Sequence, residues 1–211
     1  MVFLARLILV LAPVHAPDED VPGQDRSPEG AYVLDPLLVT PTLSGERRQD
    51  APYSAEEVDA ATFEARAYRT VPQALRDLPG VLVQETAHGH GSPYLRGFTS
   101  FRNLFLIDGI RLNNSVFRPG PNQYWNTVDP WSLESLEVVM GPSSVLYGSD
   151  AMGGTVQAFT KSPWARMPLD GSWGGMLAYR WADAENYDQA RLEAFGPLGE
   201  HTALGLSLIH I

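Results

Sequence analysis

The sequence lacks cysteine, long apolar runs and an excess of basic residues. With no cysteine among 211 residues, no disulfide framework can form. No stretch of about 20 apolar residues occurs, so we expect no membrane-spanning helix. Lys and Arg number 15 against 25 Asp and Glu, a net charge of −10. This balance argues against a nucleic-acid partner, because phosphate contacts need a basic face.

Most of the negative charge lies near the N-terminus. Residues 17–60 contain 11 acidic and 3 basic residues, interspersed with prolines. This composition predicts an extended, poorly ordered region, which we place at residues 17–45. Residues 1–16 before it resemble a secretory signal peptide, with an apolar stretch after Arg6. The alternative is an apolar N-terminus created by a wrongly assigned start codon.

A short apolar, β-prone segment, Leu34–Thr42, lies inside the acidic region. One interpretation is the first strand of the domain that follows. The other is an extended peptide that adds itself as a strand to a partner's sheet, with main-chain hydrogen bonds supplying the affinity.

The stretch that begins at Leu136 predicts a strand, a sharp turn and a short helix. Apolar residues alternate over residues 136–140, which is the period of a half-buried strand. Pro142 suits the first position of a helix over Ser143–Tyr147. Gly148 can end this helix in a left-handed conformation.

A second strand is expected after this helix. Gly153-Gly154 allows a tight reversal, and Thr155–Thr160 resumes β-rich alternation. A glycine-rich strand, turn and helix also suggests a phosphate-binding loop. That interpretation fails, because Gly148 is followed by Ser149-Asp150 instead of Lys and Ser/Thr, and an aspartate would repel phosphate.

Helical signals extend over Val58–Leu78. Asp59 and Thr62 are candidate caps, and Pro72 stands near a first turn. Pro79-Gly80 ends the helical region.

A two-residue hairpin is the best local signal in the chain. Leu104–Ile107 and Ile110–Leu112 flank Asp108-Gly109, which suits a type I′ turn with two positive φ angles. Val81–Val83 predicts a short strand, and Leu95–Phe98 predicts another.

Residues 84–93 are expected to form a glycine-rich loop with His88 and His90 two positions apart. A His-x-His pair can ligate a metal or haem iron, but it needs a third ligand that the sequence does not supply. The alternative is a solvated loop.

Residues 113–128 predict a long loop before a short helical turn at Asp129-Pro130. The loop combines aromatic rings, amides and a cation, which suits a polar, ring-bearing ligand. The alternative is that Phe117, Tyr124 and Trp125 pack against the surrounding wall.

Three segments near the C-terminus, residues 171–181, 191–195 and 201–209, alternate weakly and are edged with aromatics. The outward-suited side chains of the first are Trp173, Leu177 and Tyr179. Such segments are typical of membrane β-barrel strands. Because an open sheet edge cannot face lipid, we expect a truncated chain, with residues 207–211 as a possible non-native end.

Several motifs, in the right order, resemble the plug domain of TonB-dependent outer-membrane receptors. They are Leu34–Thr42, Leu75–Val81, Leu95–Gly97, Leu104–Arg111 and Leu136–Lys161. The last resembles the family pattern from "I-E" through "R-G-P" and "L-Y-G" to "G-G". Two positions depart from the family: Met140 stands where arginine is usual, and Pro41 replaces a common alanine.

The resemblance implies an α+β plug domain, a small mixed sheet with short helices, at residues 46–162. The first strands of an antiparallel transmembrane β-barrel would follow at residues 163–211. It also implies a receptor in the outer membrane of a Gram-negative bacterium, with a periplasmic N-terminus. Energy-coupled movement of the plug would import a scarce, bulky ligand such as a ferric siderophore, haem or cobalamin. The alternative is a non-transporting periplasmic plug-like binding module, or an inactive gene fragment.

Residues 34–42 would be the TonB box in this resemblance. The residues implied to bind TonB are Leu34, Asp35, Pro36, Leu37, Leu38, Val39 and Thr40. The outer-loop residues implied to contact the ligand are His88, His90, Phe101, Arg102, Phe117, Arg118, Asn122, Tyr124 and Trp125.

The implied partners are TonB with its inner-membrane energising complex, outer-membrane lipid and a small-molecule metal chelate. We expect no resident cofactor or metal and no enzyme activity, because no nucleophile–base motif, zinc spacing or cofactor fingerprint occurs.

Overall fold

The computed structural model describes residues 37–87, 89–113, 120–121, 124–166, 168, 171–183, 187–199 and 202–210. These residues form two compact units, one ending at Thr160 and the other beginning at Lys161. Among them, no helix is long and apolar enough to cross a membrane. The predicted signal peptide, residues 1–16, lies outside the described residues.

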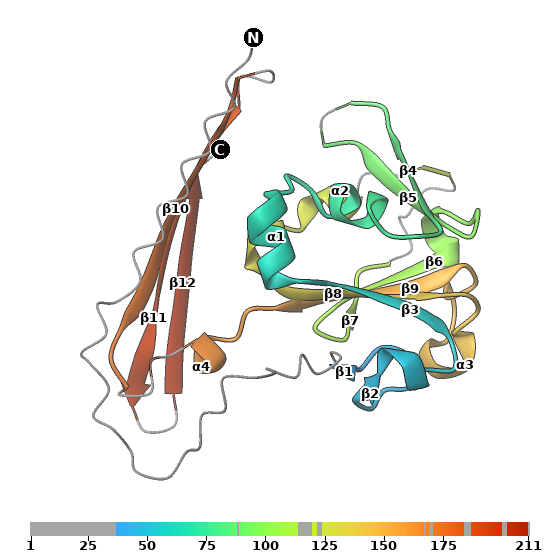
Figure 1. Cartoon of the computed structure of the whole chain (residues 1–211), viewed down its shortest axis with the longest axis horizontal. Helices are drawn as coiled ribbons and strands as arrows, with labels where there is room; N and C mark the ends of the chain where they lie inside the picture. The colour runs from blue at the N-terminus through green and yellow to red at the C-terminus, as the bar shows by residue number, and fades with distance from the viewer. Residues whose placement is uncertain are drawn as a thin grey trace, which may run out of the picture. The chain divides into compact units, whose positions relative to one another are not determined.

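The first unit is built on one mixed β-sheet with the strand order β3-β8-β9-β6-β7 (Figure 1). Its strands are β3 (Ser54–Asp59), β6 (Asn103–Ile107), β7 (Ile110–Arg111), β8 (Leu133–Met140) and β9 (Gly154–Thr160). β6 and β9 are parallel, whereas the other neighbours are antiparallel. The helices of this unit are α1 (Ala60–Arg66), α2 (Val71–Arg76) and α3 (Ser144–Tyr147). The predicted α+β domain with a small mixed sheet and short helices is confirmed.

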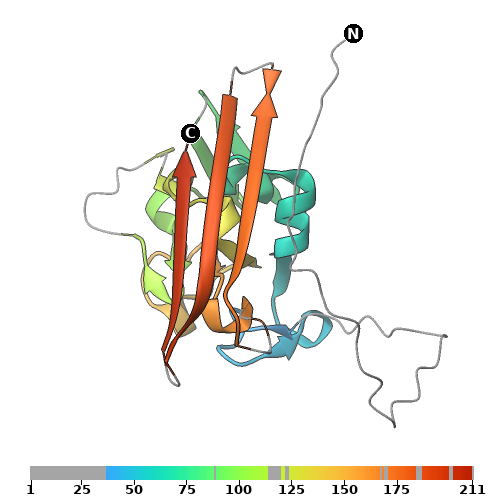
Figure 2. The same cartoon turned by 90° about the vertical axis from the view of Figure 1, so that its left-hand side faces the viewer.

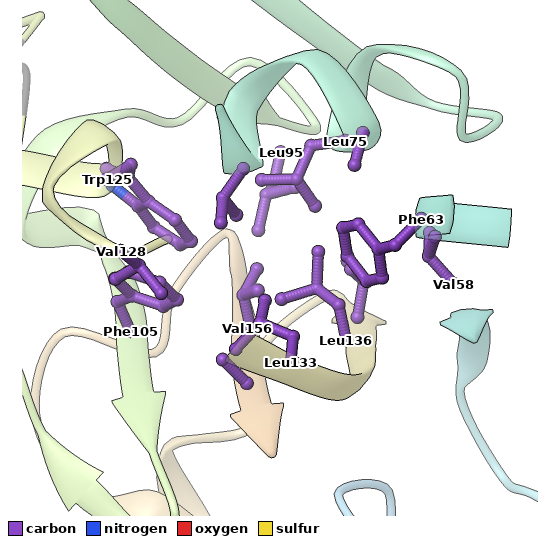
Figure 3. Packing of buried hydrophobic residues seen from close by; sticks show 14 of the residues in the cluster. Val58, Phe63, Leu75, Leu95, Phe105, Trp125, Val128, Leu133, Leu136 and Val156 are labelled. Atoms are coloured by element: carbon purple, nitrogen blue, oxygen red, sulfur yellow. The ribbon is translucent and has the colours of Figure 1, made fainter. Parts of the chain in front are cut away.

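The main core lies on the face of the sheet that α1 and α2 cover (Figures 1 and 3). Its larger side chains include Val58, Phe63, Leu75, Leu95, Phe105, Trp125, Leu133, Leu136 and Val156. Burial of one such aliphatic or aromatic side chain contributes roughly 1.5–3 kcal/mol. This cluster therefore fixes the helices on the sheet.

The opposite face of the sheet is also covered. There β1 (Leu37–Leu38) pairs with β2 (Glu46–Arg47), and both lie on the same side of the sheet as α3 (Figure 1). The prediction of a half-buried strand at residues 136–140 is wrong, because all five residues of that stretch are buried. The sequence alternation failed here because segments distant in the chain cover both faces of β8.

The predicted helical region from Val58 to Leu78 contains two helices, α1 and α2. Asp59 caps α1, since its side chain accepts a hydrogen bond from the Thr62 backbone at 2.8 Å, and this part of the prediction is confirmed. Val58 belongs to β3 and α1 begins at Ala60, so the predicted helical region starts too early. Ala67, with φ of 49°, ends α1, and Pro72 lies in the first turn of α2 as predicted.

The predicted loop at residues 84–93 is instead mostly a hairpin. β4 (Val81–Glu85) pairs with β5 (Gly91–Leu95), so only residues 86–90 connect them. The predicted strand at Leu95–Phe98 is also wrong. Arg96 and Gly97 have φ of 50° and 84°, and they form a turn closed by hydrogen bonds between Leu95 and Phe98.

The hairpin of β6 and β7 confirms the type I′ prediction. Asp108 and Gly109 have φ of 48° and 80°, the two positive angles that this turn requires. The Asp108 carboxylate accepts from the backbone N–H and hydroxyl of Thr160, at 2.8 and 2.7 Å. The turn is thereby fixed to the end of β9.

The turn around α3 differs in detail from the prediction. Ser143 is the N-cap residue, so Pro142 precedes the helix instead of opening it. Gly148 has the predicted positive φ of 78°, but its ψ of −146° is not left-handed helical. Gly153 and Gly154 serve close packing more than reversal, since a Cβ on Gly154 would lie 2.5 Å from the Val139 carbonyl oxygen.

The second unit is a sheet with the strand order β10-β11-β12, and Figure 2 shows its three strands side by side. Its elements are α4 (Pro163–Arg166), β10 (Gly174–Ala182), β11 (Tyr187–Gly199) and β12 (Thr202–His210). All neighbours are antiparallel, which confirms the predicted strands.

The two faces of this second sheet differ in polarity. Leu177, Leu192 and Leu208 are register partners on one face and are exposed. Trp173, Tyr179 and Trp181 are exposed as well, as predicted for the first two. On the other face, buried Glu193 forms ion pairs with Arg191 and with Arg166 of α4. One face is therefore apolar and the other polar.

Candidate functional site

The chain before β3 returns across the second face of the first unit's sheet. We define the docked segment as Leu37–Leu43. β1 pairs with β2, and the Leu43 backbone N–H donates to the Val39 carbonyl at 2.8 Å. The prediction of disorder over residues 17–45 is therefore wrong for residues 37–45. The rest of that region, including Leu34, Asp35 and Pro36, lies outside the described residues.

A single carboxylate holds the centre of the docked segment. The Glu137 oxygens accept from the backbone N–H of Val39 at 2.9 and 3.1 Å and of Thr40 at 2.7 Å. Glu137 stands in β8 and is only 3% exposed. Hydrogen bonds to an ionised acceptor are about twice as strong as neutral ones. Glu137 thus satisfies two main-chain donors in the turn that follows β1.

Further contacts complete the docking. The Tyr147 hydroxyl of α3 donates to the Thr40 carbonyl at 2.7 Å, and the Thr40 hydroxyl lies 3.5 Å from the Gln157 amide oxygen. Leu38 packs against Ala55 and Val139 in a small buried cluster. The sheet and α3 therefore bind main-chain polar groups of the segment, and the sheet buries one of its apolar side chains.

Burial, reinforced by the nearby Glu137 carboxylate, raises the pKa of Tyr147 to about 12. The hydroxyl therefore keeps its proton at neutral pH and remains a donor to Thr40. Because the pKa is raised, this contribution is complete below the ordinary tyrosine value of 10.0 and is lost only as the pH rises toward 12.

Two carboxylates face each other beneath the docked segment. Glu57 of β3 and Glu137 of β8 are directly opposite in the antiparallel ladder. Burial first, and then the charges of Glu137 and Asp59, raises the pKa of Glu57 above its ordinary value of 4.5. When both carboxylates are ionised, their repulsion weakens the pairing of β3 and β8.

We expect Glu57→Gln to strengthen the β3–β8 pairing at pH 7 by up to about 1 kcal/mol, since directly opposed like charges are destabilising. The raised pKa sets the sign. Wild-type stability falls as the pH rises through that pKa, so wild type and variant should agree near pH 4. Hydrogen exchange of the β3 and β8 amides, corrected for intrinsic rates, measures this difference. The exposed Glu134→Gln on β8 is the control, and equal gains at both pH values would contradict the expectation.

The structure describes five of the nine predicted ligand residues. His88, Phe117, Arg118 and Asn122 lie outside the described residues. His90 is exposed, Tyr124 is half-buried, and no group of three His, Asp or Glu in the described part of the chain could hold a metal ion. Phe101 and Arg102 are exposed, and the guanidinium lies 5.3 Å from the centre of the Phe101 ring.

Trp125 is a core residue in this structure. It is 2% exposed and stacks on Phe105, with ring centroids 3.6 Å apart and an interplanar angle of 16°. This burial favours core packing, which was the alternative interpretation for this residue, and direct ligand contact stays an untested prediction.

Sequence reasoning missed Glu137, Tyr147 and Gln157 as site residues. The signal for Glu137 was its position as a charged residue within an apolar stretch. The alternation of β8 predicts that this side chain faces solvent, where water would satisfy it. Tyr147 and Gln157 had no local signal, because their contacts with Thr40 join residues 107 and 117 positions apart.

A family model described as the TonB-dependent receptor plug domain matches residues 47–155, just over half of the chain. The chain belongs to this plug domain family. The matched range of the plug includes Glu137 and Tyr147, whereas the docked segment precedes it.

Several curated proteins are similar to this plug. The iron-regulated outer membrane virulence protein of Vibrio cholerae is 36% identical over 130 residues, covering 59% of this chain and 20% of that protein. The vitamin B12 transporter BtuB of Vibrio vulnificus is 29% identical over 130 residues, covering 61% and 21%. The ferrioxamine B receptor of Salmonella typhimurium is 34% identical over 182 residues, covering 82% and 24%. The chain spans about a fifth to a quarter of these relatives.

The fold is also similar to that of solved structures. The siderophore receptor PiuA from Acinetobacter baumannii matches with a TM-score of 0.58 and 21% identity, covering 83% of this chain and 23% of that one. At this identity the match shows the fold alone.

Proposed function

We propose that this plug belongs to an outer-membrane transporter that imports a scarce, bulky metal chelate in a TonB-dependent step. The docked segment, together with Leu34–Pro36, is the part that binds TonB. The observation that supports this most is the binding of the Val39 and Thr40 main-chain groups by plug side chains. Main-chain groups are also what a peptide offers when it adds a strand to a partner's sheet. Docking and partner binding would therefore compete for the same atoms.

The second unit supports a membrane location. β10 and β12 contain nine residues each, close to the roughly 9–11 that a tilted strand needs to cross a bilayer. One face of the sheet presents Leu, Trp and Tyr side chains, and the other buries Arg and Glu. An apolar outer face with a polar inner face is what a transmembrane strand requires.

The names of relatives support a ligand class. These names refer to ferrioxamine B, vitamin B12, hemin and iron regulation. We therefore propose a ferric siderophore, haem or cobalamin as ligand. Among the described residues, His90, Phe101, Arg102 and Tyr124 remain candidates for contact, whereas burial disfavours Trp125.

Uptake by cells that make the full-length gene product tests this function. Labelled ferrioxamine B, haem and cyanocobalamin are each supplied to cells with and without TonB, and binding and uptake are measured separately. We expect uptake of one ligand, only with TonB. Val39→Pro removes the backbone N–H of Val39, so it should abolish uptake while leaving ligand binding to the cells intact. Val39→Ala keeps that N–H and is the matched control. Uptake without TonB, or by the proline variant, would contradict the proposal.

A further inference from the structure

Helix α3 connects the docked segment to a distant strand of the sheet. It contains only four residues, and its last residue, Tyr147, supplies the hydroxyl that donates to the Thr40 carbonyl. Val145 of this helix is 96% exposed, so α3 has little apolar packing of its own on that side. The Tyr147 ring packs against the buried residues Leu104, Leu106 and Ala151, and polar contacts hold the two ends of the helix.

The N-terminal end of α3 is held by the body of the sheet. The Ser143 hydroxyl is hydrogen-bonded to the Thr155 hydroxyl of β9 at 2.6 Å in a buried position. The Ser144 hydroxyl donates to the Ala151 carbonyl at 3.2 Å, within the same turn. This end is fixed to a central strand and is expected to move little.

The C-terminal end of α3 is held by a side chain from β7. One guanidinium nitrogen of Arg111 donates to the Tyr147 carbonyl at 2.6 Å, and another donates to the Ser149 carbonyl at 2.9 Å. The second nitrogen also lies 3.1 Å from the Asp150 carboxylate. Carbonyls at a helix end have no partner within the helix, and a basic side chain can satisfy them.

Arg111 stands on the shortest strand of the sheet, at its edge. β7 contains two residues and lies at the end of the strand order. It pairs with β6, where Arg111 is opposite Leu106 and Ile110 is opposite Ile107. A displacement of this short edge strand would move the guanidinium, whereas Glu137 and Gln157 stand on the central strands β8 and β9. Of these three anchors of the segment, Tyr147 is the one that stands on a short helix outside the sheet, and Arg111 binds the end of that helix.

We propose that Arg111 is a positioning residue for the docked segment, acting through α3. With Arg111 bound to the Tyr147 and Ser149 carbonyls, the Tyr147 hydroxyl reaches Thr40 and the segment stays docked. When β7 moves and these contacts are lost, the turn after α3 relaxes, the hydroxyl withdraws, and the segment is released more often. This inference rests on the proposed function only in naming the segment as the TonB-binding one.

A buried thiol in the segment measures its release directly. The printed sequence contains no cysteine, so Thr40→Cys introduces a single reactive group into it. Thr40 is fully buried, and its thiol should react with a maleimide only when the segment leaves the sheet. When closing is faster than labelling, the labelling rate follows the equilibrium population of the released state. The full-length gene product, free of other cysteines, is labelled in detergent without ligand or TonB.

We expect Arg111→Ala to raise the labelling rate of the Thr40→Cys thiol by roughly tenfold, the effect of losing about one net hydrogen bond to a charged donor. Tyr147→Phe should give a rise of similar size, since it removes the hydroxyl itself. If Arg111 acts through Tyr147, the double variant should label no faster than Tyr147→Phe alone. Arg76→Ala, which removes another exposed arginine that is ion-paired with Glu85, should change nothing.

Three results would overturn the proposal. The first is an unchanged labelling rate in Arg111→Ala. The second is an equal rise for a thiol placed at Ala74, a buried position in α2, which would show general loosening of the plug. The third is a further, independent rise when Arg111→Ala is added to Tyr147→Phe. The labelling experiment contains neither ligand nor TonB. It therefore tests the role of Arg111 even if the transport proposal is wrong.

Discussion

Replacement of Glu137 by alanine should raise the population of the released docked segment at least 100-fold. The variant leaves the backbone N–H groups of Val39 and Thr40 without the carboxylate that accepts from both. Hydrogen bonds to charged groups contribute roughly 1.5–3 kcal/mol each, so two of them correspond to at least a 100-fold change in the release equilibrium. We expect the labelling rate of the Thr40→Cys thiol to rise by about that factor.

An opposing effect must be weighed against this loss. Alanine also removes a buried charge and its repulsion with Glu57, which lies directly opposite. A like-charge pair across a ladder costs only about 0.2–1 kcal/mol, less than the two hydrogen bonds. The net effect is therefore release.

Two further variants make the test of Glu137 specific. Glu137→Gln keeps a carbonyl oxygen as acceptor but loses the charge, so we expect an intermediate rise of roughly tenfold. Glu134→Ala removes an exposed glutamate from the same strand and should have no effect. A labelling rate that is the same in wild type and Glu137→Ala would refute the role assigned to this carboxylate.

Local signals explain which parts of the fold could be predicted. The Asp108-Gly109 turn and the Asp59 cap depend on residues within a few positions of each other, and both are confirmed. The hairpin of β4 and β5 was missed because its exposed side contains polar residues and glycine, which resemble a loop in composition. A polar composition indicates solvent exposure, which a strand at the surface shares with a loop.

The candidate site could be predicted only in part, because its contacts join distant positions. Sequence pattern identified the residues that dock, Leu37–Thr40, as an extended peptide. It did not identify what binds them, since Val39 and Glu137 are 98 positions apart. Segments distant in the sequence also cover both faces of β8. The alternation of side chains along a single strand cannot reveal this burial.

Trp125→Ala should cost about 3–5 kcal/mol of plug stability, as expected for removal of a buried aromatic side chain. The indole stacks on Phe105 of β6 and closes one end of the main core beside Val128 (Figure 3). The cavity would separate the short 3-10 helix at Tyr124–Thr127 from the sheet. Hydrogen exchange of the β6 and β9 amides measures the loss.

The same variant distinguishes the two interpretations of this aromatic residue. If Trp125 contacts the ligand, Trp125→Ala should lower the ligand affinity and leave the hydrogen exchange of the β6 and β9 amides unchanged. Phe101→Ala is the matched control, because Phe101 is an exposed aromatic whose removal should cost less than about 0.5 kcal/mol. Trp125→Phe keeps a ring for the stack with Phe105 and should recover most of the stability. Normal exchange with reduced affinity in Trp125→Ala would contradict core packing and return Trp125 to the ligand site.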